Sequence, residues 1–156
     1  MEAVAYDWVS LLLRWTHLIV GIAWIGSSFF FVWLDLSLRK REGGDPGVQG
    51  EAWLVHGGGF YFTEKYMNAP DRMPADLHWF KYEAYFTWIT GFLLLGVIYY
   101  WGAESFLIDP DVMELSQWQA IGISMALLAA GWVAYDLICR SPIGQNTALL
   151  AIAVFV

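Results

Sequence analysis

The chain has 156 residues, of which 58% are hydrophobic, 18% are aromatic and 15% are charged, and its formal net charge is −7. About a quarter of the residues of a soluble domain are usually charged, so this composition indicates a membrane protein and excludes an ordinary soluble domain. In a membrane protein this net charge carries no information about nucleic acid, and no basic stripe suggests nucleic acid as a partner. The single cysteine, Cys139, excludes both a disulfide framework and the C-x-x-C-H motif that attaches c-type haem.

Apolar runs long enough to cross a bilayer occur three times along the chain. Because about 20 helical residues at 1.5 Å each cover the hydrocarbon core, these runs predict transmembrane helices at about residues 8–38, 82–101 and 118–139, with a fourth, incomplete span from residue 147 onward. The expected fold class is therefore an all-α polytopic membrane protein with three full transmembrane helices and the start of a fourth. We expect residues 1–156 to form the N-terminal part of one membrane domain, cut within its fourth span.

The predicted loop at residues 39–81 sets the orientation of the protein. Lys and Arg accumulate in cytoplasmic loops, and this loop contains Arg39, Lys40, Arg41, Lys65, Arg72 and Lys81, whereas residues 102–117 contain no basic residue. The pattern predicts an N-terminus outside the membrane and a cytoplasmic loop at 39–81. Within that loop, two aromatic-rich runs on either side of three glycines predict a β-hairpin or a compact loop against the membrane surface.

The first predicted span has a face of polar and small residues. Spacings of three and four place on this face Arg14, His17, Gly21, Trp24, Ser28, Phe31 and Asp35. Ionisable side chains within a span usually face the interior of the helix bundle, although Arg14 and Asp35, near opposite interfaces, can equally well extend into water. His17 lies one turn deeper than Arg14 and its ring cannot reach as far, so a ligand or redox role and simple packing both remain open.

The other two histidines, His56 and His78, are predicted on the cytoplasmic side. His56 precedes three glycines, whose backbone could offer N–H groups to an anion or form a tight turn; both interpretations remain open. His78 lies near Glu83 at the start of the second span, where it could ligate a metal, carry protons or cap the helix. Because His17 is predicted at the opposite side of the membrane, one haem cannot be bound both by His17 and by His56 or His78. On the second predicted span, four polar or small residues share one helical face and are expected to form a packing seam: Glu83, Thr87, Thr90 and Gly91.

Three segments of the sequence carry a family resemblance: LLLRWTHLIVGIAWIGSSFFFVWLDLSL, GVQGEAWLVHGGGFYFTEKYM and PADLHWFKYEAYFTWITGFLLL. Together they resemble the N-terminal membrane domain of the bacterial membrane-bound urate oxidases of the PuuD type. The resemblance implies an eight-span domain followed by a periplasmic c-type cytochrome domain in the bacterial inner membrane. It also implies oxidation of urate to 5-hydroxyisourate, with electrons passed to the cytochrome rather than released as hydrogen peroxide.

The resemblance transfers no catalytic residue, so the candidate site rests on side-chain chemistry. Urate is a planar purine anion whose oxidation needs a proton acceptor, an anchor for the anion and a route for electrons. The candidates are His56, His78 and Glu83 for catalysis, Gly57, Gly58 and Gly59 for urate binding, His17 and Arg14 for a cofactor, and His17 and His78 as haem-iron ligands. The expected cofactors are haem c in the C-terminal domain, by resemblance, and a candidate haem b in the membrane domain. The expected partners are urate, membrane lipid and a c-type cytochrome domain or protein, and a chain of this extent is expected to be inactive alone.

Three other functions remain open from the sequence. A haem-binding membrane oxidase with another substrate, such as the small four-helix protoporphyrinogen oxidases, also carries a histidine among tryptophans and small residues in its first helix. A transporter or channel subunit could use the polar face of the first span as a path. A structural or assembly subunit would bury the same residues only for packing.

Overall fold

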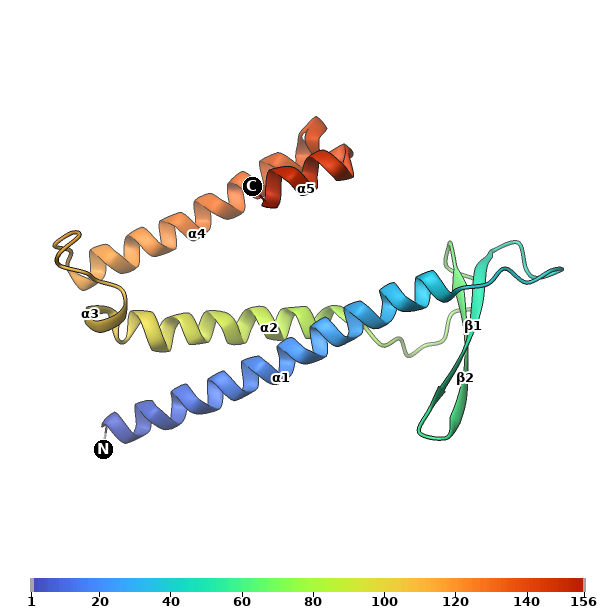
Figure 1. Ribbon diagram of the computed structural model, residues 1–156, viewed down its shortest axis with the longest axis horizontal. Helices are drawn as coiled ribbons and strands as arrows, with labels where there is room; N and C mark the ends of the chain where they lie inside the picture. The colour runs from blue at the N-terminus through green and yellow to red at the C-terminus, as the bar shows by residue number, and fades with distance from the viewer. Residues whose placement is uncertain (1, 156) are drawn as a thin grey trace. The chain divides into compact units, whose positions relative to one another are not determined.

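The computed structural model of the protein describes residues 2–155 (Figure 1). In chain order the elements are α1 (Glu2–Ser37), β1 (Val48–His56), β2 (Gly59–Tyr66), α2 (Lys81–Leu94), the π-helix η1 (Leu95–Tyr100), α3 (Ala103–Phe106), α4 (Gln117–Arg140), the 3-10 helix η2 (Pro142–Gln145) and α5 (Thr147–Phe155). They form two compact units, one of residues 11–92 and one that combines the residues up to 10 with those from 93 onward.

Helix α1 is one unbroken helix of 36 residues, which corresponds to a length of about 54 Å at 1.5 Å per residue. Its sequence has no proline, so nothing interrupts the i to i−4 hydrogen bonds. The helix ends before a segment in which Gly43, Gly44 and Pro46 favour turns. Its length exceeds the thickness of about 30 Å that a bilayer core presents.

Helix α4 is the second long apolar helix, with 24 residues. The side chain of Ser116 accepts a hydrogen bond from the Gln119 backbone N–H, and the Gln119 side chain accepts one from the Ser116 backbone N–H, so a capping box fixes the start of the helix. Pro142 follows the last residue, Arg140, and cannot continue the helical hydrogen bonds. The helix expected at 118–139 is therefore present.

Among the residues that the structure describes, two helices are long and apolar enough to cross a membrane, Ala3–Ser37 and Gln117–Arg140. Only 6% and 0% of their most apolar windows are buried, whereas the core helix of a soluble protein would be mostly buried. Large apolar side chains such as Phe29 and Trp132 are each 69% exposed. Such extensive apolar surface needs lipid or a protein partner to cover it, which favours association with a membrane.

The expected all-α fold with three full transmembrane helices and the start of a fourth is wrong on two counts. Among the described residues only two helices meet the requirements of a span, and the two-stranded antiparallel sheet, although a hairpin was expected in the loop at 39–81, means that the fold is not all-α. In the segment expected to be the second span, the α-helix ends at Leu94 after 14 residues and the backbone continues as the π-helix η1, where the N–H of Trp101 donates to the carbonyl of Gly96. The segment expected to begin the fourth span forms α5, of nine residues.

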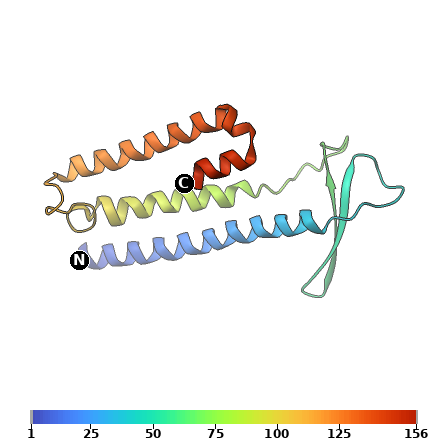
Figure 2. The same cartoon turned by 45° about the horizontal axis from the view of Figure 1, so that its top comes forward.

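The β-hairpin expected between the first two helices is confirmed. Strands β1 and β2 pair antiparallel from Val48 opposite Tyr66 to His56 opposite Gly59, as the adjacent strands of Figure 2 show. The two residues between the strands, Gly57 and Gly58, have φ angles of 58° and 80°. Positive φ at both central residues is the signature of a type I′ turn, which matches the twist of a hairpin and which glycine adopts without strain.

In the unit that contains α4, small side chains bring the helices together. Ala103 and Ala120 are 1% and 5% exposed, and the Tyr100 and Ser124 hydroxyl groups are 3.0 Å apart. The Gln117 side-chain amide, at the start of α4, donates a hydrogen bond to the backbone carbonyl of Tyr100, the last residue of η1. These contacts connect the end of η1 to the first turns of α4.

Candidate functional site

Helices α1 and α2 pack antiparallel within the unit of residues 11–92, and their facing side chains form the best-defined polar site in it. Along α1 the buried or half-buried side chains include Leu13, His17, Val20, Ser27 and Leu34. Their spacing of three, four or seven residues is the 3.5-residue repeat of a helix-packing seam. The seam is displaced from the face expected from the sequence, since Arg14, Trp24 and Ser28 are exposed.

His17 lies where this seam meets α2. Its Nδ1 is 2.9 Å from the hydroxyl of Thr90, a residue that is only 6% exposed. The ring also lies against Gly91, where an added Cβ would be 3.2 Å from the Cε1 atom of His17. Gly91 thus allows the ring to approach the backbone of α2 more closely than any side chain would permit.

Glu83 occupies a second polar position on the same interface, nearer the hairpin. The Ser27 hydroxyl on α1 donates a hydrogen bond to the half-buried Glu83 carboxylate on α2. One turn further along α2, Thr87 donates its hydroxyl proton to the Glu83 carbonyl. The contact connects the two helices through a half-buried carboxylate, where an unpaired charge would be costly.

His78 lies outside the helix pair, in the segment that precedes α2. Its ring is exposed and meets the edge of Phe80 at 4.5 Å between centroids, and Phe80 in turn contacts Phe31 of α1 at 4.8 Å. The neighbouring Lys81 ammonium lies 4.7 Å from the centre of the Trp79 ring, a cation–π contact. His78 is therefore held by aromatic packing at the α1–α2 end, with its nitrogens accessible.

His56 is the last residue of β1 and lies at the hairpin turn, where it is exposed. The glycines that follow it, predicted to bind urate, form the type I′ turn and begin β2. This geometry accounts for Gly57 and Gly58 as turn residues, and anion binding by the three glycines stays a prediction.

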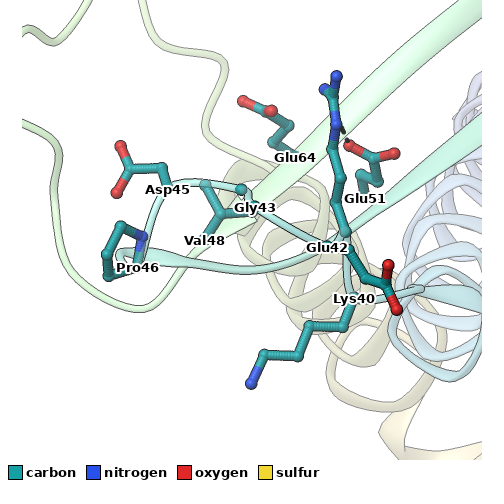
Figure 3. A pocket seen from close by; sticks show the side chains of 10 residues that line it. Lys40, Glu42, Gly43, Asp45, Pro46, Val48, Glu51 and Glu64 are labelled. Carbon is teal, nitrogen blue, oxygen red and sulfur yellow. Dashed lines mark ion pairs between the residues drawn. The ribbon is translucent and has the colours of Figure 1, made fainter.

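Charged side chains connect the hairpin to the end of α1. Lys65 on β2 donates to Asp35 at 2.7 Å, and the backbone of Arg39 pairs with that of Glu51. Arg41 lies 3.7 Å from Glu51 (Figure 3), beside an open cavity formed by the turn after α1. These ion pairs are exposed or partly exposed, so each contributes little stability alone.

The structure thus brings two of the predicted site residues, His17 and Glu83, to one helix interface, and leaves the others elsewhere. His56 is at the hairpin turn, His78 is in the segment before α2, and Arg14 is exposed on α1 one turn before His17. Within residues 2–155, no three or more His, Cys, Asp or Glu side chains gather closely enough to hold a metal ion.

The sequence reasoning missed the partners of both residues. Thr90 was expected only in a packing seam, and Ser27 was not among the residues of the polar face that included Ser28. The signal was present, because Glu83, Thr87 and Thr90 follow the same three-and-four spacing as the seam of α1. What the spacing could not supply was the antiparallel register that sets Ser27 opposite Glu83 and His17 opposite Thr90.

Comparison with known proteins identifies the family of this chain. No curated protein and no solved structure matches the chain. A family model described as "Urate oxidase N-terminal" matches residues 3–156, which include every element of the structure except the first residue of α1. The match confirms the resemblance to urate oxidases seen in the sequence segments of α1, the hairpin and α2, and the chain belongs to the urate oxidase N-terminal family.

Proposed function

We propose that this chain is part of a membrane-bound oxidoreductase that oxidises urate to 5-hydroxyisourate and passes the electrons to a c-type cytochrome. The family match over residues 3–156 carries the proposal, because it ties the chain to urate and to oxidation. The two long helices with exposed apolar surfaces support a location in a membrane. The identity of the electron acceptor, a c-type cytochrome, is the more specific part of the proposal.

The reaction must release two protons and two electrons. Urate and one water molecule give 5-hydroxyisourate, two protons and two electrons, so a new C–O bond forms while the electrons leave to the acceptor. A c-type cytochrome takes one electron per haem, so two haems or two encounters complete each turnover. Cys139 is the only cysteine of the chain, so a haem attached through two thioethers is held by another domain or protein.

Three residues of the chain are the proposed acceptors of the released protons. Glu83 is half-buried and already receives a hydrogen bond from Ser27, whereas His56 and His78 are exposed and accessible to a substrate. A general base must come within hydrogen-bond reach of the proton that it removes. The glycines at the hairpin turn remain the proposed anchor of the urate anion through their backbone N–H groups.

The contact between His17 and Thr90 supports the proposed role of His17 as a haem ligand. Metal-bound histidines usually donate their second ring N–H to a fixed acceptor, and the contact between His17 Nδ1 and the Thr90 hydroxyl provides one. A b-type haem held by Nε2 of His17 would supply one-electron transfer within the membrane. Arg14, one turn away on α1, is the proposed source of positive charge near that group.

The proposed location is the bacterial inner membrane, with α1 and α4 as spans. Arg39, Lys40 and Arg41 follow the end of α1 directly, and clusters of basic residues favour the cytoplasmic side. On this basis the N-terminal end of α1 lies outside and the hairpin lies in the cytoplasm. Cysteine accessibility to a membrane-impermeant reagent, at position 3 and at the hairpin turn, tests the two sides.

A reduction experiment tests the activity. Membranes that contain the full-length protein are examined by absorbance difference spectroscopy before and after addition of urate, with xanthine as the control purine. Reduction of c-type haem by urate alone is the expected result, and an additional b-type band that is lost in His17→Ala supports the role of His17. Haem that dithionite reduces but urate does not would contradict the substrate and favour an oxidase of another class. Uptake of urate without any haem reduction would instead favour a transporter.

A further inference from the structure

The hydrogen bonds around Thr90 determine where the proton of the His17 ring lies. The Thr90 hydroxyl oxygen is 2.8 Å from the Phe86 carbonyl and 3.1 Å from the Thr87 carbonyl, both within α2. Carbonyl oxygens only accept hydrogen bonds, so the single hydroxyl proton of Thr90 is used there. Toward His17, 2.9 Å away, Thr90 therefore offers a lone pair and accepts the Nδ1–H.

This network assigns one tautomer to the neutral His17 ring. With the proton on Nδ1, the Nε2 atom carries a free lone pair. Among the residues that the structure describes, Nε2 has no hydrogen-bond partner, and no buried side-chain nitrogen or oxygen lacks one, so this atom remains accessible. The ring thus presents an electron-pair donor at a defined position in the α1–α2 interface.

Gly91 fixes the position of the ring from a second direction. A Cβ at residue 91 would lie 3.2 Å from Cε1 of His17, closer than most carbon contacts, and 3.7 Å from Nδ1, an ordinary van der Waals distance. Any side chain at this position would push the ring away from α2 by a few tenths of an ångström and lengthen its hydrogen bond to Thr90. Both constraints come from consecutive residues of one helix turn.

We propose that Thr90 and Gly91 are positioning residues that hold His17 in the Nδ1–H tautomer, so that Nε2 presents its lone pair to an electron-pair acceptor. Two acceptors share this chemistry, a haem iron and an N–H proton of urate; the second requires urate to bind at His17 in place of the anchor proposed at the hairpin glycines. The use of Nε2 rests on the proposed function, whereas the positioning itself follows from the contacts of α1 with α2. The consequence is that the side chain at residue 90 controls the ring tautomer without touching the ligand.

Nitrogen-15 NMR of the full-length protein labelled at histidine tests the positioning directly. The His17 signals are assigned by their loss in His17→Ala. In the wild type we expect a protonated Nδ1 and an unprotonated, or iron-shifted, Nε2. Thr90→Val removes the acceptor and should shift the ring toward the Nε2–H tautomer, whereas Thr90→Ser should retain the wild-type pattern.

Thr87→Val is the matched control, because within residues 2–155 the Thr87 hydroxyl forms its hydrogen bond with the Glu83 carbonyl of its own helix and not with His17. It makes the same change one turn away and should leave the His17 signals unchanged. Thermal unfolding of each variant separates a shift in tautomer from a loss of fold. If Thr90→Val folds and keeps the wild-type tautomer, or if Thr87→Val changes it equally, the positioning role is refuted.

Activity and haem content then distinguish the two acceptors. Removal of such a partner of a metal-bound histidine typically costs 10- to 100-fold in affinity or activity, so Thr90→Val and Gly91→Ala should lose urate turnover by about that factor, with rescue in Thr90→Ser. A parallel loss of b-type haem supports iron, and a loss of turnover with haem retained supports a proton of urate. If the wild type does not oxidise urate, the proposed function fails while the NMR result still decides the positioning.

Discussion

The hydrogen bond between Ser27 and Glu83 gives the sharpest test of how α1 and α2 are held together. Ser27→Ala removes the hydroxyl that donates to the half-buried carboxylate and leaves that carboxylate without this donor. Loss of one partner of a buried polar group costs about 1–3 kcal/mol, a change of about 5- to 150-fold in the unfolding equilibrium. The upper part of this range applies if Glu83 is ionised, because hydrogen bonds to charged groups are stronger.

Ser28→Ala provides a control at the adjacent position. The Ser28 side chain is exposed and donates to the Trp24 carbonyl of its own helix at 2.8 Å, so its loss should change stability by less than about 0.5 kcal/mol, as is usual for surface substitutions. The free energy of unfolding is measured for both variants in the same detergent with a chemical denaturant.

A double-mutant cycle with Glu83→Met, which has no side-chain oxygen to accept the Ser27 proton, isolates the pair. If the contact accounts for the loss, Ser27→Ala should cost much less in the Glu83→Met background than in the wild type, and the difference is the coupling energy. Equal losses in Ser27→Ala and Ser28→Ala, or a coupling energy of zero, would refute the idea that this contact holds the helices together.

Three further outcomes are expected outside the helix interface. Gly57→Val should destabilise the hairpin by about 1–2 kcal/mol, because the φ of 58° is unfavourable for a side chain. Gly59→Ala, at a position without positive φ, should cost less. Hydrogen exchange of the β1 and β2 amides measures both effects. Ser116→Ala should cost about 1 kcal/mol and increase amide exchange in the first turn of α4, since it removes the capping hydroxyl. The Glu64 carboxylate, hydrogen-bonded to the Tyr66 hydroxyl, raises the pKa of that phenol, so Glu64→Gln should lower it, which tyrosinate absorbance over alkaline pH would detect.

The sequence allowed the local structure to be predicted where one strong signal acted alone. The apolar runs predicted helices at α1 and α4, and the glycines between aromatic runs predicted the hairpin, because a type I′ turn needs positive φ at both central residues. The prediction of a full span at residues 82–101 was wrong for a reason that hydropathy does not detect. From Leu95 to Tyr100 the hydrogen-bond pattern changes from α to π, although the side chains remain apolar.

Only half of the site could be predicted, because a helical repeat indicates which residues share a helix face but not which residues of another helix they contact. His17 and Glu83 stood out because ionisable side chains are costly among apolar ones. Their partners Thr90 and Ser27 are common seam residues, and nothing in either helix alone distinguishes Ser27 from Ser28. Only the register of two packed helices makes that distinction, and register depends on contacts along their whole length.

The two polar contacts also depend on each other. At 1.5 Å per residue, Ser27 and His17 are separated by about 15 Å along α1 and their partners Glu83 and Thr90 by about 10 Å along α2, so both contacts depend on one register of the two helices. A shift of α1 along α2 by one residue, or a rotation that brings Ser28 to the interface, would break both contacts together. The Ser27–Glu83 contact therefore fixes the position of His17 against Thr90 and Gly91 from a distance. Loss of the Ser27 hydroxyl should accordingly broaden or shift the His17 ring signals, whereas loss of the exposed Ser28 hydroxyl should not.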